Sequence, residues 1–345
     1  KMALHGARLR GPQHEGKYYC ESKKICESRG MSGKRKEREV DAADADGEVH
    51  SMRGNTILIT GGAQGLGLEV ARMAARRNAK GIVICDRNAA NSAVVEQEIQ
   101  DLGAECLFVQ CDVGVPDDIT AAVKKAEQRF GSIECLVNAA GDTTRGDLDS
   151  TSVDQWDRQQ NVNLRSVFLF TQHVSQSMRR HGVRGSIVNI ASVQAYGGLT
   201  FCMGYAVAKA ALVALTKNNA TELGRHGIRV NAINMGWTAT DNEDVLQRAE
   251  SGPDWLVNAD KTSALGRICR PADIAHGVLF LLSDAAFTTG SVMQRMYTMA
   301  QTPDTPSPPP SVHLSSCLRP ALKTVHPEFI VGMLGGGIGK ASEVK

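Results

Sequence analysis

The chain has 345 residues, and its shares of hydrophobic residues (42%) and charged residues (22%) are typical of a soluble globular protein with a substantial core. Its 39 basic and 37 acidic residues leave a net charge of +2, which excludes a chain-wide cationic surface for nucleic acid. No run approaches the ~20 apolar residues of a membrane-spanning helix, and the N-terminal residues lack the apolar segment of a secretion signal, so we expect neither.

Residues 1–53 differ from the rest of the chain. They are polar, with a basic run at 34–38 followed by the acidic residues Asp41, Asp44 and Asp46, and they show no apolar periodicity. Such a segment buries too little apolar surface to offset the entropy lost on ordering, so we predict a disordered tail. The basic run is compatible with nucleic-acid binding, but a solvated tail is the favoured interpretation.

From Thr56 onward, short apolar runs alternate with helical stretches. The expected strands are 57–59, 82–84, 107–109, 136–137, 187–190 and 230–233, with an edge strand at 291–293. The expected helices are 66–78, 92–102, 117–130, 155–181, 205–226 and 271–282. Apolar runs without polar alternation favour strands that are buried on both faces. Their alternation with helices predicts an α/β protein with a Rossmann-like, doubly wound parallel sheet.

We place this single domain at 54–293. Residues 294–325 are rich in proline, serine and threonine, which predicts a disordered insert, and 326–345 form a C-terminal tail.

The nine cysteines favour thiols over disulfides. Several lie in or beside apolar strand-like runs, namely Cys85, Cys106, Cys111 and Cys135. Buried thiols of this kind are typical of a reducing compartment, so we expect a cytoplasmic protein. Cys20 and Cys26 lack a second cysteine pair or a histidine cluster nearby, and we therefore predict no metal site.

A glycine-rich segment, Thr60–Gly67, follows the first strand and opens the first helix. Without side chains the backbone can approach a pyrophosphate closely, and the free amides of a helix N-terminus favour its negative charge. We therefore predict a dinucleotide site with contacts from Gly61, Gln64, Gly65, Leu66 and Gly67.

Asp86 ends the second strand, about 20 residues beyond the glycine segment. A carboxylate at this point accepts hydrogen bonds from the ribose hydroxyls and repels a 2′-phosphate. The neighbouring Arg87 is suited to pair with such a phosphate. We expect both Asp86 and Arg87 to contact the cofactor. We predict that this cofactor is NAD, with NADP as the less favoured alternative.

Further candidate contacts follow the third and fourth strands. Open α/β sheets bind ligands outside the carboxyl ends of their strands, so residues at these ends are expected to meet the cofactor. They are Asp112, Val113, Asn138, Ala139, Ala140 and Gly141.

The most specific feature is Tyr205 with Lys209 four positions later and Ser192 thirteen positions earlier. Positions i and i+4 share one face of a helix, which places the amine beside the phenol. We expect the ammonium, together with an oxidised nicotinamide, to lower the phenol pKa from about 10 toward neutrality. For the pair alone, an amphipathic surface helix is the simpler interpretation; the glycine segment, Asp86 and Ser192 favour catalysis.

In these motifs, residues 54–293 resemble the short-chain dehydrogenase/reductase family. The resemblance implies an NAD(P)-dependent oxidoreductase acting on a secondary alcohol or ketone, with a catalytic tetrad of Asn163, Ser192, Tyr205 and Lys209. It also implies the roles: Tyr205 as acid/base, Ser192 orienting the substrate oxygen, and Asn163 holding a water for proton relay. Lys209 and Tyr205 would in addition contact the nicotinamide ribose, and Gly236 and Thr240 the nicotinamide end.

The substrate and the assembly are less specified by the motifs. Arg145, Gln194, Trp237 and the segment 241–260 are expected to line or cover the pocket, and their polarity favours a sugar or polyol. Members of the family pair helices resembling 155–181 and 205–226, which implies a homodimer or homotetramer. The alternatives are a catalytically silent dinucleotide-binding regulator and an NADP-dependent carbonyl reductase.

Overall fold

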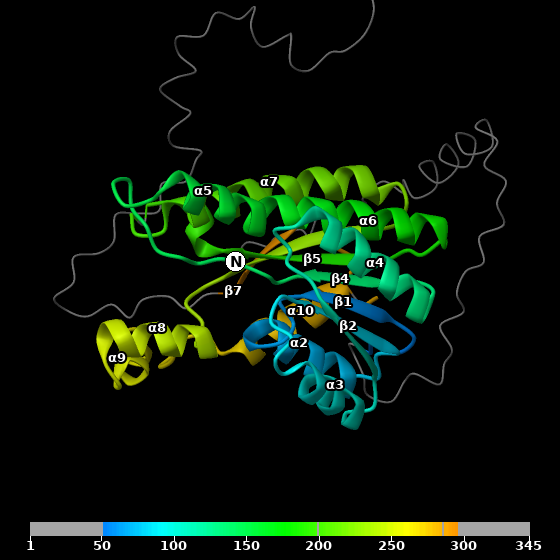
Figure 1. The fold of residues 1–345 in the computed structure, drawn as a ribbon, viewed down its shortest axis with the longest axis horizontal. Helices are drawn as coiled ribbons and strands as arrows, with labels where there is room; N and C mark the ends of the chain where they lie inside the picture. The colour runs from blue at the N-terminus through cyan, green and yellow to red at the C-terminus, as the bar shows by residue number, and fades with distance from the viewer. Residues whose placement is uncertain (1–50, 199, 285, 296–345) are drawn as a thin grey trace, which may run out of the picture. The chain divides into compact units, whose positions relative to one another are not determined.

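The computed structural model describes residues 51–198, 200–284 and 286–295. They form a seven-stranded parallel sheet with the order β3-β2-β1-β4-β5-β6-β7 (Figure 1). The strands are β1 (Thr56–Thr60), β2 (Gly81–Asp86), β3 (Glu105–Gln110), β4 (Cys135–Asn138), β5 (Ser186–Ser192), β6 (Arg229–Met235) and β7 (Val292–Arg295). This order confirms the predicted Rossmann-like, doubly wound sheet.

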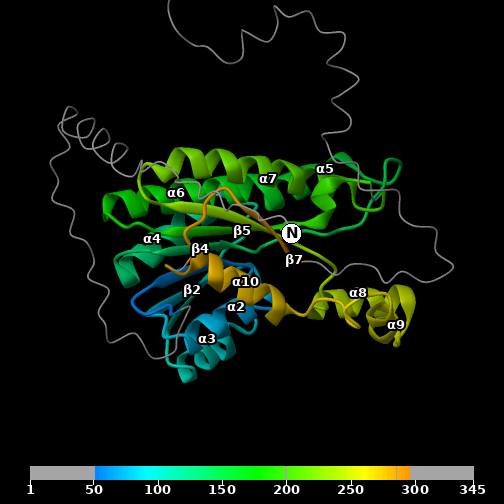
Figure 2. The same ribbon diagram turned by 180° about the vertical axis from the view of Figure 1, so that it is seen from behind.

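Helices cover both faces of the sheet, as Figures 1 and 2 show from opposite sides. One face carries α2 (Gly65–Arg76), α3 (Ser92–Asp101) and α10 (Pro271–Leu282). The other carries α4 (Pro116–Phe130), α5 (Val153–Gln160), α6 (Ser166–Arg180) and α7 (Met203–Gly224). Two further helices, α8 (Asp241–Ser251) and α9 (Trp255–Lys261), follow β6 and lie to one side of the layers.

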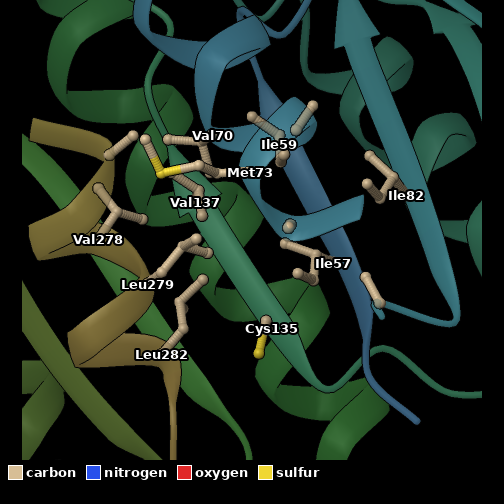
Figure 3. Close-up of a cluster of buried hydrophobic side chains, with 14 of the residues drawn as sticks. Ile57, Ile59, Val70, Met73, Ile82, Cys135, Val137, Val278, Leu279 and Leu282 are labelled. Carbon is tan, nitrogen blue, oxygen red and sulfur yellow. The ribbon is translucent and has the colours of Figure 1, made fainter. Parts of the chain in front are cut away.

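Side chains alternate between the two faces of β1, as expected for a strand that is covered on both sides. Ile57 and Ile59 join the cluster with α2 and α10, whereas Leu58 packs on the opposite face. All three are fully buried. Figure 3 shows the first cluster, which includes Val70 and Met73 of α2 and Val278, Leu279 and Leu282 of α10. Burial of each such aliphatic side chain stabilises the folded state by about 1.5–3 kcal/mol. This packing holds the strands, and therefore their carboxyl ends, in fixed positions.

The described fold includes residues on both sides of the predicted boundaries at 54 and 293. Met52 is fully buried, and its N–H donates to the carbonyl of Arg77 (2.8 Å). Strand β7 continues through Gln294 and Arg295, which pair with Asn234 and Met235 of β6. These polar residues resemble the insert in composition, but strand pairing rather than composition decides their conformation. The remainder of the predicted tail, insert and C-terminal segment lies outside the described residues.

Two helical regions also differ from the predictions. The expected helix 155–181 is interrupted by a π-helical turn, η2 (Asn161–Arg165), between α5 and α6. Helices α8 and α9 occupy a polar segment in which apolar periodicity predicts no element. Helix α8 is instead stabilised at its start, where the Thr240 hydroxyl accepts a hydrogen bond from the Glu243 N–H (3.3 Å).

The cysteines predicted to be buried, Cys85, Cys106, Cys111 and Cys135, are buried thiols. No helix in the described part of the chain is both long and apolar enough to cross a bilayer. The same residues contain no cluster of histidine, cysteine and carboxylate side chains arranged to hold a metal ion.

Candidate active site

A cleft of about 1640 Å³ lies at the carboxyl ends of the central strands, where doubly wound sheets bind their ligands. The residues predicted to form the site come from loops and strand ends that are far apart in the sequence. The structure brings all of them to the wall of this cleft except Asn138 and Asn163.

The glycine segment forms one wall of the cleft, and two of its glycines, Gly61 and Gly67, have no room for a side chain. Gly61 adopts a left-handed φ of 66°, and a Cβ on this residue would lie 2.9 Å from the Cα of Ala140. A Cβ on Gly67 would lie 2.2 Å from the carbonyl oxygen of Gly61. The Gln64 side chain makes no capping hydrogen bond to α2. The helix N-terminus is therefore open toward the cleft, as an anion site requires.

Asp86 is fixed against this wall by two backbone hydrogen bonds. Its Oδ2 accepts from the N–H of Ala63 (3.1 Å), and its Oδ1 accepts from the N–H of Asn88 (3.1 Å). Arg87 is exposed at the same end of the cleft, and no carboxylate among the described residues forms an ion pair with it. Both side chains thus lie where a ribose, or a phosphate attached to it, would be recognised.

The third strand end contributes Asp112 and Val113. Asp112 is exposed at the cleft, and its Oδ1 accepts from the N–H of Gly114 (2.8 Å) in a turn that orients the carboxylate. Val113 is buried beside it and offers an apolar surface. The pair could therefore cover a flat heteroaromatic ring and accept a hydrogen bond from it.

Asn138 lies behind the wall of the cleft rather than in it. Its side chain is buried, and its Nδ2 donates to Oδ1 of Asn189 (2.8 Å). Asn189 donates in turn to the hydroxyl of Thr216 on α7 (3.0 Å). The predicted cofactor contact is therefore a link between β4, β5 and α7, and the cleft wall at this point is formed by Ala139, Ala140 and Gly141.

Asn163 is fully buried in the π-helical turn. Its two amide hydrogens donate to the carbonyls of Asp142 (2.9 Å) and Gln159 (3.0 Å), and its Oδ1 accepts from the N–H of Asp142 (3.1 Å). Both side-chain donors are therefore engaged with the backbone. The residue joins the loop after β4 to the helix, and a relay water would have to use its Oδ1 or its backbone.

Ser192, Tyr205 and Lys209 meet in the cleft. Ser192 ends β5, and its Oγ accepts from the N–H of Gln194 (3.1 Å). Lys209 lies one turn after Tyr205 on α7, with its Nζ 5.5 Å from the centre of the phenol ring. The same Nζ donates to the carbonyl of Ile190 (2.7 Å), which fixes the amine beneath the ring. The predicted shared helix face is confirmed.

In the protein by itself, burial dominates the pKa values of the phenol and the amine. Burial raises the pKa of Tyr205 to about 12, although hydrogen bonding to Ser192 lowers it in part. Burial also lowers the pKa of Lys209 to about 8, because the amine lies in the protein interior. In the protein alone, desolvation is thus the main influence on the phenol, and the predicted lowering of its pKa by the ammonium together with an oxidised nicotinamide stays a prediction.

Loops and helix α8 close the other end of the cleft. Arg145 reaches from the loop after β4 to Glu250 of α8 (2.8 Å), and its guanidinium lies 5.1 Å from the ring of Phe201. Trp237 donates its indole N–H to Glu243 (2.7 Å), and Gln194 lines the cleft nearby. Six residues of the segment 241–260 line this end of the cleft with these side chains, namely Asn242, Glu243, Leu246, Gln247, Glu250 and Ser251. That this end receives the substrate stays a prediction.

Comparisons with known proteins agree with this geometry. Residues 61–295 match a family model described as enoyl-(acyl carrier protein) reductase, which extends over the whole sheet except β1. The chain belongs to the short-chain dehydrogenase/reductase family. It is therefore an oxidoreductase that acts on CH–OH groups, in a family that uses NAD or NADP.

Relatives of this dehydrogenase differ in their named substrates. A 3-alpha-(or 20-beta)-hydroxysteroid dehydrogenase from Mycobacterium bovis is 35% identical over 69% of this chain and 86% of its own length. A gluconate 5-dehydrogenase from Gluconobacter oxydans is 32% identical over 71% and 94%. The crystal structure of a short-chain type dehydrogenase/reductase from Mycobacterium marinum aligns with a TM-score of 0.66 at 29% identity, covering 72% of this chain and 96% of that one.

Sequence reasoning predicted that the segment 241–260 lines or covers the pocket, but it did not name the individual residues that do so. Glu243 and Gln247 line the cleft, and Trp255 packs on Trp237 with ring centres 5.8 Å apart. A usable signal was present, since Thr240 followed three residues later by Glu243 has the spacing of a helix capping box. That spacing predicts where α8 begins.

We predict that Lys209→Met changes how the stability of the dehydrogenase depends on pH. Because the pKa of the amine falls from 10.5 to about 8 on folding, the unfolded chain binds more protons between these values. The free energy of unfolding of the wild type should therefore rise relative to Lys209→Met by about 3 kcal/mol between pH 8 and 10.5. Denaturant unfolding across this range measures the difference, and Lys217→Met, at an exposed position of α7, is the control. A constant difference would contradict the burial of a titrating amine.

Proposed function

We propose that the protein transfers a hydride between NAD and a secondary alcohol or ketone, with Tyr205 as the acid/base. The observation that supports this most directly is that Ser192, Tyr205 and Lys209 line the same cleft as the glycine segment. We call the part of the cleft formed by that segment the glycine wall. The fit of a dinucleotide is supported by the backbone of Gly61 and Gly67, where side chains have no space. When bound, NAD supplies the acceptor for the hydride.

The roles of the side chains follow from their positions. During oxidation the Tyr205 oxygen takes the hydroxyl proton of the substrate. The carbon that bears this hydroxyl group loses a hydride to NAD, so that a ketone forms. The Ser192 hydroxyl holds the substrate oxygen, and Lys209 supplies positive charge beneath the ring. Burial raises the pKa of Tyr205, which favours the neutral phenol that donates a proton during reduction, whereas oxidation needs the phenolate.

The function is tested with purified protein, both cofactors and a panel of secondary alcohols, polyols, sugars and ketones. Absorbance of the reduced nicotinamide reports turnover, and its fluorescence reports binding. We expect turnover with NAD and at least one hydroxylated substrate. Binding of NADH without turnover of any panel member would instead favour the dinucleotide-binding regulator.

The proposed preference for NAD is supported by Asp86. We predict that Asp86→Ala weakens this preference. The fixed carboxylate would accept ribose hydrogen bonds and repel a 2′-phosphate. Loss of hydrogen bonds to a charged group should lower the NAD-to-NADP ratio of kcat/KM by about 10- to 100-fold.

Arg87→Ala is the matched comparison for Asp86→Ala at the same end of the cleft. If the wild type prefers NADP and Arg87→Ala abolishes that preference, Arg87 rather than Asp86 determines the choice, and the carbonyl reductase alternative gains support. An unaltered ratio in Asp86→Ala would remove the carboxylate from cofactor selection.

We also propose a sugar-like or polyol substrate and a homodimeric or homotetrameric assembly. The polar lining of the substrate end supports the first, although the relatives named above include both a steroid and a sugar-acid enzyme. Partly exposed apolar side chains on the outer helices support the second, with Phe168 of α6 44% and Val207 of α7 46% exposed. Sedimentation of the purified protein measures the assembly.

A further inference from the structure

Glu243 is a half-buried carboxylate at the substrate end of the cleft that has no cationic partner. Its Oε1 accepts two hydrogen bonds, from the indole N–H of Trp237 (2.7 Å) and from the amide of Gln247 (2.9 Å). Both donors are neutral, and no lysine, arginine or histidine in the described part of the chain pairs with this carboxylate. Its negative charge therefore remains available to a ligand.

Two arginines of the cleft lining are already paired with other carboxylates. Arg145 pairs with Glu250 (2.8 Å), and Arg158 pairs with Asp142 (2.7 Å). Two further carboxylates of the lining, Asp154 and Asp157 of α5, are exposed to solvent and so are better screened than Glu243. Glu243 and Tyr205 line the same cleft, so one bound molecule can meet both groups.

The position of Glu243 is held on three sides. Its own N–H donates to the hydroxyl of Thr240 (3.3 Å), which fixes the first turn of α8. Gln247, only 6% exposed, lies one turn further along and also accepts from the hydroxyl of Ser251 (3.3 Å). The ring of Trp237 packs against Trp255. No side chain or backbone group in the described part of the chain donates a hydrogen bond to its second carboxylate oxygen, and an ionised carboxylate can only accept hydrogen bonds.

We infer that Glu243 determines substrate specificity by accepting a hydrogen bond from a second hydroxyl group of the substrate and by repelling substrates that carry a carboxylate at that place. This inference rests on the proposed function, since it assigns a partner to the molecule that Tyr205 would oxidise. It narrows the substrate class to neutral di- and polyhydroxy compounds. A carboxylate of the substrate would be repelled by the charge of Glu243, whereas a hydroxyl group can donate a hydrogen bond to it.

Matched probes on one ring separate these possibilities. They are cyclohexanol, cis-1,2- and cis-1,3-cyclohexanediol, and the hydroxycyclohexanecarboxylates of the same two geometries. Binding is measured by calorimetric titration of the Tyr205→Phe protein loaded with NADH, so that no turnover is needed, and kcat/KM is measured with the protein bearing Tyr205. We expect at least one diol to bind more tightly than cyclohexanol and than its matching hydroxycarboxylate.

Glu243→Gln keeps the size of the side chain and the oxygen that Trp237 and Gln247 contact, but removes the charge. It should lower the ratio of diol to hydroxycarboxylate affinity, and of the matching kcat/KM values, by about tenfold or more. The control is Asp241→Asn, which removes one charge from the exposed side of the same helix turn, away from the cleft. It should leave both ratios as in the parent protein.

The inference is overturned if Glu243→Gln leaves the ratios unaltered, if Asp241→Asn shifts them equally, or if no diol binds better than its hydroxycarboxylate. Failure of the proposed function looks different. In that case no probe would be turned over by the protein with Tyr205, while the calorimetric ratios would still report whether Glu243 selects for hydroxyl groups.

Discussion

Turnover is expected to fall by about 10²- to 10⁴-fold when Tyr205 is replaced by phenylalanine, which is the usual contribution of a positioned acid/base. The substitution keeps the ring that lies 5.5 Å from the Lys209 amine and removes only the hydroxyl that would exchange the proton. NADH affinity should stay close to that of the parent protein, because the glycine wall and Asp86 are unaltered. Stopped-flow single-turnover measurements and a fluorescence titration check the two parts separately.

Tyr196→Phe is the matched control for this experiment. Tyr196 is 70% exposed, lies outside the cleft lining, and accepts a hydrogen bond from Gln294 through its hydroxyl (2.7 Å). The same chemical change there should leave turnover intact. Full turnover by Tyr205→Phe, or an equal loss in Tyr196→Phe, would remove Tyr205 from the chemistry.

Because the pKa of Tyr205 is raised, its role as acid/base should also make turnover depend on pH. Oxidation needs the phenolate, so kcat/KM for oxidation should rise with pH over the range in which the phenol is mostly protonated. Reduction needs the phenol and should be insensitive to pH over the same range. This difference between the two directions should disappear in the residual activity of Tyr205→Phe.

The parts of the fold that follow from local chemistry were predictable from the sequence. Strand β1 is apolar at three successive positions, 57–59, because helices cover both of its faces, and that pattern leaves few alternatives. Gly61 and Gly67 are recognisable in the sequence because they stand in a turn between a strand and a helix. In that turn, neighbouring backbone leaves no space for a side chain at either position. Tyr205 and Lys209 meet because the spacing of a helix dictates it.

The parts that depend on tertiary packing were not predictable. Asn138 and Asn163 occupy the expected strand end and helix, but nothing in the sequence indicates that their amides turn into buried networks instead of the cleft. The pKa of Tyr205 depends on how completely neighbouring elements exclude water from it, which spacing along one helix does not determine. Likewise, β7 reaches Arg295 only because β6 offers it a partner.

Gly67→Ala is expected to weaken NADH binding by roughly 100-fold, the upper part of the range for inserting a methyl group into a closely packed site. The new Cβ would lie 2.2 Å from the carbonyl oxygen of Gly61 and 2.9 Å from the Cα of Gly62. Both contacts are with backbone, so the clash cannot be relieved by rotating a side chain. The glycine wall or the first turn of α2 must move, and either movement displaces the amides proposed to hold the pyrophosphate.

Gly224→Ala, at the end of α7, introduces the same methyl group where nothing lies within 4 Å, and it should bind NADH like the parent protein. Thermal unfolding of both variants without cofactor distinguishes a loss of overall stability from a defect confined to the pyrophosphate site. Because the clash is confined to the loop and the first turn of α2, Gly67→Ala should remain folded at the temperature of the titration. A folded Gly67→Ala protein that binds NADH as tightly as Gly224→Ala would show that the glycine wall does not hold the dinucleotide.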